Sequence, residues 1–130
     1  MNLKQMIIAK NMGKMIQKEY KNPYIIYTLK RGKRIDILNS DIIKEIIEKD
    51  ILRTDSRKKI KFVINLKGIK FIDSHGFRVL LELTGISKIY NNQLYFANIS
   101  GEVKELIQLL ELKDVFSKRE IVIPEDKIAA

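Results

Sequence analysis

The chain has 130 residues and no cysteine, which suits one domain with a single core and excludes disulfide and thiolate chemistry. Its apolar runs are far shorter than the roughly 20 residues that cross a bilayer, so we expect a soluble protein of the cytoplasm. The formal net charge of +9 is concentrated in residues 1–34, where nine Lys or Arg oppose one Glu.

The N-terminal part predicts two strands behind a short extension. Residues 1–13 form the extension, and weak alternation from Met15 to Tyr20 predicts an edge strand. Asn22-Pro23 predicts a turn, and the β-branched and aromatic residues of 24–29 predict a second strand. A basic loop follows, with Lys30, Arg31, Lys33 and Arg34.

The next segment predicts a helix that lies on a sheet. Ser40 and Asp41 are typical of a helix start, and five isoleucines then recur at helical spacing on one stripe. Residues 60–66 form a nearly continuous apolar strand of the kind buried on both faces in α/β sheets. Gly68 allows a turn after this strand. The five isoleucines are Ile42, Ile43, Ile46, Ile47 and Ile51.

A second amphipathic helix is predicted from Phe77 to Tyr90, entered through Ser74. Gly85 lies inside it and weakens its second half by about 1 kcal/mol relative to alanine. Asn91-Asn92 predicts the next turn, because asparagine tolerates left-handed backbone angles.

The C-terminal part predicts one more strand and helix before the chain ends. Residues 93–99 predict a strand, and Ser100 predicts the cap of a helix with Val103 and Ile107 on its apolar face. Residues 121–123 predict a last strand, and 124–130 a C-terminal tail. Because strand and helix alternate, the sequence predicts an α/β domain with neighbouring parallel strands.

The junction Phe71-Ile72-Asp73-Ser74-His75-Gly76 places a serine hydroxyl at a helix start. The first backbone N–H groups of a helix lack intrahelical acceptors, and the macrodipole adds about half a positive charge there. Such a site tolerates a phosphate group, so Ser74 is a candidate phosphorylation site. The alternative is simple capping of the helix by Asp73 or Ser74.

The stretch from Phe62 to Leu81 resembles the central signature of the STAS domain of anti-sigma-factor antagonists, in which an apolar strand and a turn precede Phe-Ile-Asp-Ser-Ser-Gly and a helix. Residues 35–40 are similar to the Leu-Asp segment before the first helix of that family. Residues 94–100 are similar to its later strand and helix cap. Together these resemblances cover most of residues 14–123, which we expect to form one STAS domain.

The resemblance implies a central mixed sheet of about four to five strands packed with about four α-helices. It also implies a non-enzymatic regulator that binds an anti-sigma factor or serine kinase and is switched off when that kinase phosphorylates Ser74. Asp36 matches the acidic residue that the family fold brings near the phosphorylation loop. Its alternative role is that of an ordinary loop carboxylate. The predicted partner-binding loop comprises Asp36, Asp73, His75 and Gly76.

His75 departs from the family pattern, which has a small hydroxyl residue at this position. As the neighbour of Ser74 it suggests a nucleophile and its base, but adjacent helical residues diverge by about 100° around the axis. With one histidine and no cysteine, the chain also offers only scattered carboxylates to a metal ion. We expect no enzyme activity, no cofactor and no metal.

Two other functions stay open. The domain can serve as a non-catalytic scaffold or accessory subunit of a signalling assembly or transporter, as similar domains do. The less favoured alternative is a nucleic-acid-binding module that uses the basic residues 1–34, although no DNA- or RNA-binding motif accompanies them. The basic loop, Lys30 to Arg34, either is solvated or lies near Ser74 and attracts an acidic partner or an attached phosphate.

Overall fold

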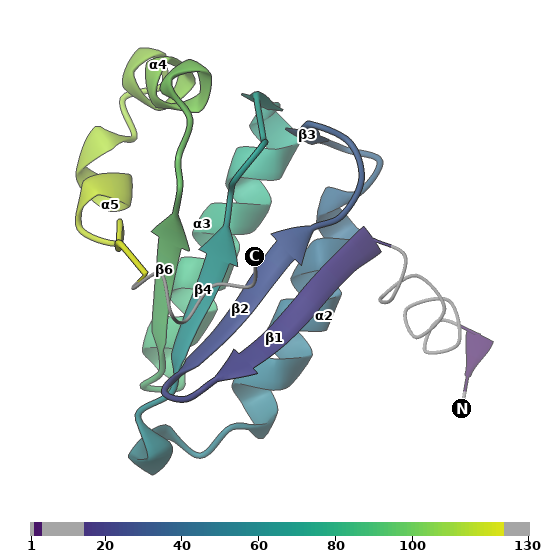
Figure 1. Ribbon diagram of the computed structural model, residues 1–130, viewed down its shortest axis with the longest axis vertical. Coiled ribbons are helices and arrows are strands. Elements are labelled where there is room, and N and C mark those ends of the chain that lie inside the picture. Colours follow the sequence, from purple (N-terminus) through teal and green to yellow (C-terminus); the bar gives the residue numbers. More distant parts are fainter. Residues whose placement is uncertain (1, 4–14, 124–130) are drawn as a thin grey trace.

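The computed structural model describes residues 2, 3 and 15–123, and a four-stranded sheet forms the centre of this part (Figure 1). The strand order is β1-β2-β4-β6, with β1 antiparallel to β2 and the other neighbours parallel. The sheet is therefore mixed, and β1 lies at its edge, as the sequence predicts. The strands are β1 (Ile16–Lys21), β2 (Tyr24–Leu29), β4 (Lys61–Asn65) and β6 (Gln93–Ala97).

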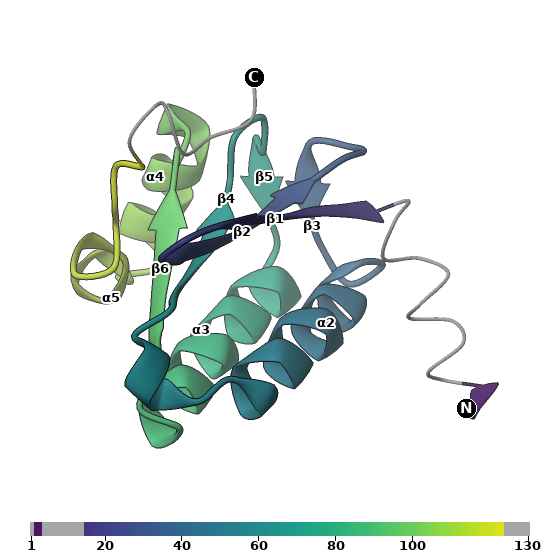
Figure 2. The ribbon, with the colours of Figure 1, turned by 60° about the horizontal axis from the view of Figure 1, so that its bottom comes forward.

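Two long helices, α2 (Ser40–Arg53) and α3 (Ser74–Ile89), lie side by side on one face of the sheet (Figure 2). The shorter helices α4 (Gly101–Leu109) and α5 (Lys113–Ser117) lie beyond β6 (Figure 1). A 3-10 turn, η1 (Ser56–Lys58), joins α2 to β4. The described residues thus form a single α/β fold with four α-helices, which confirms the predicted fold class.

A second, two-stranded sheet was not predicted. Its strands, β3 (Arg34–Ile35) and β5 (Phe71–Ile72), pair in parallel and place Ile35 opposite Ile72. β3 leads into α2 and β5 leads into α3. The small sheet therefore holds the starts of the two long helices next to each other.

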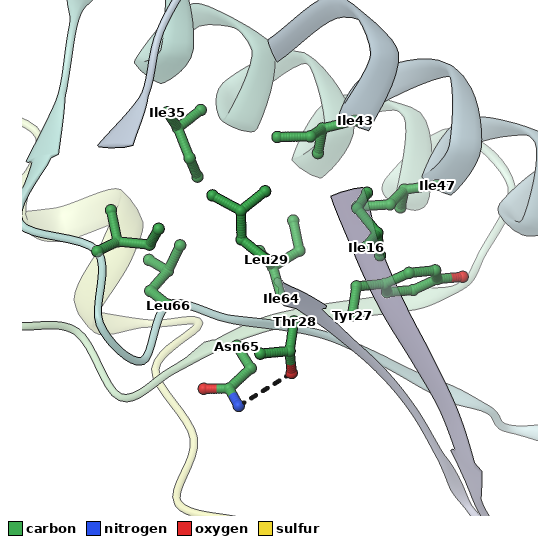
Figure 3. Close-up of a pocket in the computed structure, with 11 residues that line it drawn as sticks. Ile16, Tyr27, Thr28, Leu29, Ile35, Ile43, Ile47, Ile64, Asn65 and Leu66 are labelled. Carbon is green, nitrogen blue, oxygen red and sulfur yellow. Dashed lines mark hydrogen bonds between the residues drawn. The ribbon is translucent and has the colours of Figure 1, made fainter. Parts of the chain in front are cut away.

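The main core lies between the sheet and helices α2 and α3. The predicted isoleucine stripe of α2 faces this core, with Ile47 and Ile51 fully buried and Ile42 half-buried. Figure 3 shows the aliphatic side chains of Leu29, Ile35 and Ile43 around a cavity in this layer. Its volume is about 20 Å³, which holds roughly one water molecule, so this cavity is too small for an organic ligand.

Three sequence predictions need correction in the C-terminal part. The strand predicted over 93–99 ends at Ala97, because Asn98 adopts a left-handed backbone with φ of 57°. The strand predicted over 121–123 is wrong, since only an isolated bridge joins Phe96 to Glu120. Instead of continuing along the sheet edge, the chain buries Ile123 on the second face of the sheet. Helix α5 was not predicted.

The turns and the second long helix agree better with the sequence. Gly68 has a positive φ of 83°, and Asn91 has one of 56°, as their predicted turns require. Helix α3 begins at Ser74 and passes through Gly85 without interruption. The predicted extension and tail lie outside the described residues, apart from residues 2 and 3, so the domain limits at 14 and 123 stay predictions.

Candidate functional site

Ser74 is the first residue of α3, and its side chain is exposed. The capping task belongs to Asp73, whose backbone is extended and whose Oδ1 accepts a hydrogen bond of 2.7 Å from the Gly76 amide. Among the described residues, the Ser74 hydroxyl and the amides of Ser74 and His75 have no hydrogen-bond partner. The hydroxyl is therefore available for chemistry, beside two amides that can donate hydrogen bonds to an anion.

The loop before α2 lies against the Ser74 junction. The second oxygen of Asp73, Oδ2, accepts a hydrogen bond of 3.1 Å from the Ile37 amide. The Asp73 amide donates to the Ile35 carbonyl at 3.1 Å. Asp73 thus connects two segments that are 36 residues apart in the sequence, and this loop forms the second wall of the candidate site.

Asp36 lies in this second wall, as expected, but its carboxylate serves its own loop. One oxygen accepts a hydrogen bond of 2.9 Å from the Leu38 amide, and the other lies 3.2 Å from Nε of Arg34. The side chain is 14% exposed. The geometry is that of a residue that fixes the shape of the loop rather than one that reaches Ser74.

Gly76 is required for the close approach of α3 to the small sheet. A Cβ atom at this position would lie 2.7 Å from the Ile35 carbonyl oxygen and 2.8 Å from Cγ2 of Ile72. Real side chains do not approach other atoms this closely, so β3 and β5 would have to move. The glycine of the motif is thus explained by packing.

Both ring nitrogens of His75 have partners other than Ser74. Nε2 lies 3.0 Å from Oδ1 of Asp41, and Nδ1 lies 2.8 Å from Nη2 of Arg78. Because a guanidinium only donates, Nδ1 must accept from Arg78, and the ring hydrogen lies on Nε2, which donates to Asp41. His75 is consequently unavailable as a base for the Ser74 hydroxyl in this arrangement.

The basic loop reaches the same region through its last residues. The Lys33 carbonyl accepts hydrogen bonds from the amides of Lys70 and Phe71, at 2.6 and 3.3 Å. The Arg34 guanidinium lies 5.0 Å from the centre of the Phe71 ring, a cation–π contact. The side chains of Lys30 and Arg31 are exposed in the preceding part of the loop.

Sequence reasoning missed the exposed apolar side chains around Ser74. Ile37 is 64% exposed, Leu38 is 83% exposed and Phe71 is 39% exposed. All three belong to the loop before α2 or to β5, the two segments that Asp73 connects. These side chains belong to no apolar periodicity, so the sequence carries no signal of their exposure.

Within the stretches that the structure describes, no three His, Cys, Asp or Glu side chains are grouped so as to hold a metal ion. In the same stretches, no helix combines the length and apolar character needed to span a bilayer. The surface around Ser74 combines its exposed hydroxyl with the apolar side chains of Ile37, Leu38 and Phe71 and the guanidinium of Arg34.

The chain matches the STAS domain family over residues 16–125. Its fold is similar to that of Bacillus SpoIIAA in the phosphorylated form, with 17% identity, 85% of this chain and 93% of that chain covered, and a TM-score of 0.61. The anti-sigma factor antagonist SpoIIAA in its unphosphorylated form gives 18% identity, 85% and 90% coverage, and a TM-score of 0.64.

An anion transporter contains a similar fold. The murine anion transporter Slc26a9 gives 17% identity and a TM-score of 0.63, with 81% of this chain but only 17% of the transporter chain covered. At these identities the similarity to solved structures concerns the fold alone, whereas the family match spans most of the chain. The protein therefore belongs to the STAS domain family.

Proposed function

We propose that this STAS domain is an anti-sigma-factor antagonist that binds an anti-sigma factor or similar serine kinase in the cytoplasm and is released when Ser74 is phosphorylated. The observation that carries the proposal is the exposed Ser74 hydroxyl at the first residue of α3, where Asp73 already caps the helix. The protein itself is not an enzyme in this scheme. The partner contributes the ATP and the transfer chemistry.

In the transfer step, the Ser74 oxygen forms a bond to the γ-phosphorus of the ATP bound by the partner. The bond between that phosphorus and the ADP oxygen breaks, and the hydroxyl proton leaves to a base on the kinase. The product carries about −1.5 to −2 charges at Ser74, next to the unpaired amides of Ser74 and His75. Because these amides and the helix dipole favour an anion, the domain accommodates the phosphate with little movement.

The surface around Ser74 supports the proposal that the same phosphate weakens partner binding. Exposed Ile37, Leu38 and Phe71 offer apolar area for contact with a partner, and the basic loop attracts an acidic one. A partner surface that fits these groups and a neutral hydroxyl meets a dianion after phosphorylation. Burying a dianion against a partner surface that does not offer it a cation of its own costs several kcal/mol.

The test starts from the partner that the unphosphorylated protein captures from the cells that produce it, with and without phosphatase treatment. The captured kinase should add one phosphate, at Ser74, and Ser74→Asp should lower its affinity at least tenfold. Ser56→Asp is the matched control, because Ser56 also follows a capping aspartate, Asp55, at a helix start. It lies at the other end of the sheet, before β4, and should change the affinity less than twofold. Phosphorylation of another residue, or normal binding by Ser74→Asp, would contradict the proposal.

A second candidate function is that of a structural module in a larger assembly or transporter. The similarity to the STAS part of an anion transporter favours it, since that protein carries the fold as 17% of its chain. Native mass spectrometry of the protein purified from its own cells separates the two. A stable large assembly supports the structural role, whereas a small complex with a kinase supports the regulatory one.

A further inference from the structure

Arg78 lies one helical turn after Ser74, and its guanidinium already points back toward the start of α3. Its Nη2 donates to Nδ1 of His75 at 2.8 Å. Side chains on a helix lean toward its N-terminus, so this direction is the ordinary one for an arginine. The guanidinium therefore lies beside the residue that follows the candidate phosphorylation site.

The helix geometry also brings Arg78 into the sector of Ser74. At about 100° per residue, position 78 lies about 40° around the axis from position 74 and about 60° from position 75. Residues four apart on a helix are neighbours on its surface, so the exposed Arg78 side chain can turn from His75 toward Ser74 by rotation of its own bonds. No movement of the backbone is needed.

The present partners of Arg78 hold it weakly. The side chain is 63% exposed, and His75 offers it one neutral nitrogen. Its distance to the nearer oxygen of Glu82 is 3.6 Å, whereas Lys44 binds the other oxygen of Glu82 at 2.6 Å. Glu82 is thus paired mainly with Lys44 and only weakly with Arg78. A phosphate with three acceptor oxygens can therefore compete well for the Arg78 guanidinium.

We propose that Arg78 is the internal cation for a phosphate on Ser74: after phosphorylation, its guanidinium leaves His75 and donates two N–H groups to the phosphate oxygens. The inference rests on the proposed function, because it concerns the same serine. The exchange changes no covalent bond. It leaves Nδ1 of His75 without its hydrogen-bond donor. It also fixes the position of the phosphate on the surface that the partner contacts.

The experiment uses the full chain with phosphoserine incorporated at position 74 during translation, so that no kinase is required. The phosphate is titrated by phosphorus NMR in the wild-type background, in Arg78→Gln and in Lys88→Gln. Lys88 is the control because its loss removes the same charge from the last turn of α3. Asp41, Asp73, His75 and Glu82 surround the site in all three proteins, so the comparison isolates Arg78.

We expect the second pKa of the phosphoserine, ordinarily near 6, to be higher by about 0.5 in Arg78→Gln and unchanged in Lys88→Gln. Nitrogen NMR should show the His75 Nδ1 signal shifting on phosphorylation in the wild type but hardly in Arg78→Gln. An equal phosphoserine pKa in wild type and Arg78→Gln would overturn the inference. Because Arg78 is exposed, its replacement leaves the fold intact, which circular dichroism verifies.

The two proposals fail in different ways. If phosphoserine at position 74 leaves partner binding unchanged while Arg78 still lowers its pKa, the proposed function is wrong and the internal ion pair is right. If phosphoserine abolishes partner binding but its pKa does not depend on Arg78, the proposed function stands and the ion pair is absent.

Discussion

The two long helices begin with similar sequences, Asn39-Ser40-Asp41 and Asp73-Ser74-His75, and follow paired strands of the same small sheet. Their serines nevertheless differ completely in exposure. Ser40 is fully buried and its hydroxyl has no partner among the described residues, whereas Ser74 is exposed. A serine at a helix start is thus no guide to accessibility.

The connections to the two helices differ in length and in hydrogen bonding. One residue, Asp73, separates β5 from α3, whereas the four residues 36–39 separate β3 from α2. The Asn39 side chain bonds back to the Asp36 amide and the Arg34 carbonyl instead of capping α2. The short connection leaves the first residue of α3 at the surface, whereas the longer connection leaves the first residue of α2 buried.

The largest expected effect concerns the glycine that lets α3 approach the small sheet. Gly76→Ala places a Cβ within 2.7 Å of the Ile35 carbonyl, so we expect the free energy of unfolding to fall by about 2 kcal/mol or more. Gly85→Ala is the control in the same helix, because nothing lies within 4 Å of its added Cβ. It should raise the free energy of unfolding by up to about 1 kcal/mol. Urea titration measures both, and equal values for the two variants would refute the close approach.

The next effect concerns the cap of α3. Asp73→Ala removes the acceptor of the Gly76 and Ile37 amides, which should lower the free energy of unfolding by about 1–2 kcal/mol. Asp73→Asn keeps a side-chain oxygen for the cap and should lose less than half of that amount. Denaturant unfolding of the pair provides the measurement. If Asp73→Asn lowers the free energy of unfolding as much as Asp73→Ala does, loss of the helix cap does not explain the effect.

Ser100, unlike Ser74, caps its helix with its own side chain, so its replacement should have a moderate effect on stability. Its hydroxyl accepts from the Val103 amide at 3.2 Å and donates to the Ile69 carbonyl at 2.8 Å. Ser100→Ala should therefore lower the free energy of unfolding by about 1 kcal/mol. A loss below about 0.3 kcal/mol in thermal and urea unfolding would show that these bonds contribute little.

The smallest effects concern Ser40 and Ser74, the serines at the starts of the two long helices. Ser40→Ala removes a buried hydroxyl without a partner, so we expect unchanged or slightly higher stability, by up to about 1 kcal/mol. Ser74→Ala changes an exposed side chain and should stay within about 0.5 kcal/mol of the wild type. Thermal unfolding of both variants checks this. A strong loss in Ser74→Ala would mean that the hydroxyl has a structural role.

Elements with a long apolar pattern could be predicted from the sequence. β2 has the predicted bounds, and the isoleucine stripe of α2 faces the core. The strands β3 and β5 have two residues each and are too short to show any periodicity, so the sheet that joins the helix starts could not be predicted from the sequence. The strand predicted over 121–123 failed because burial of Ile123 on the second face prevailed over pairing at the edge.

The candidate site was predictable as a set of residue types but not as a surface. The motif indicated Ser74 and its cap, because helix starts have a recognisable chemistry. The exposure of Ile37 and Leu38 depends on tertiary packing. A single sequence does not specify such packing at surface positions.

Phosphate mapping by mass spectrometry, after incubation of the protein with ATP and its captured partner, tests directly whether Ser74 is the residue that the partner phosphorylates. We expect one phosphate per chain, on Ser74, which is lost in Ser74→Ala and retained in Ser40→Ala and Ser56→Ala. A phosphate on any other serine, or a partner that transfers none to the exposed Ser74, would contradict this expectation.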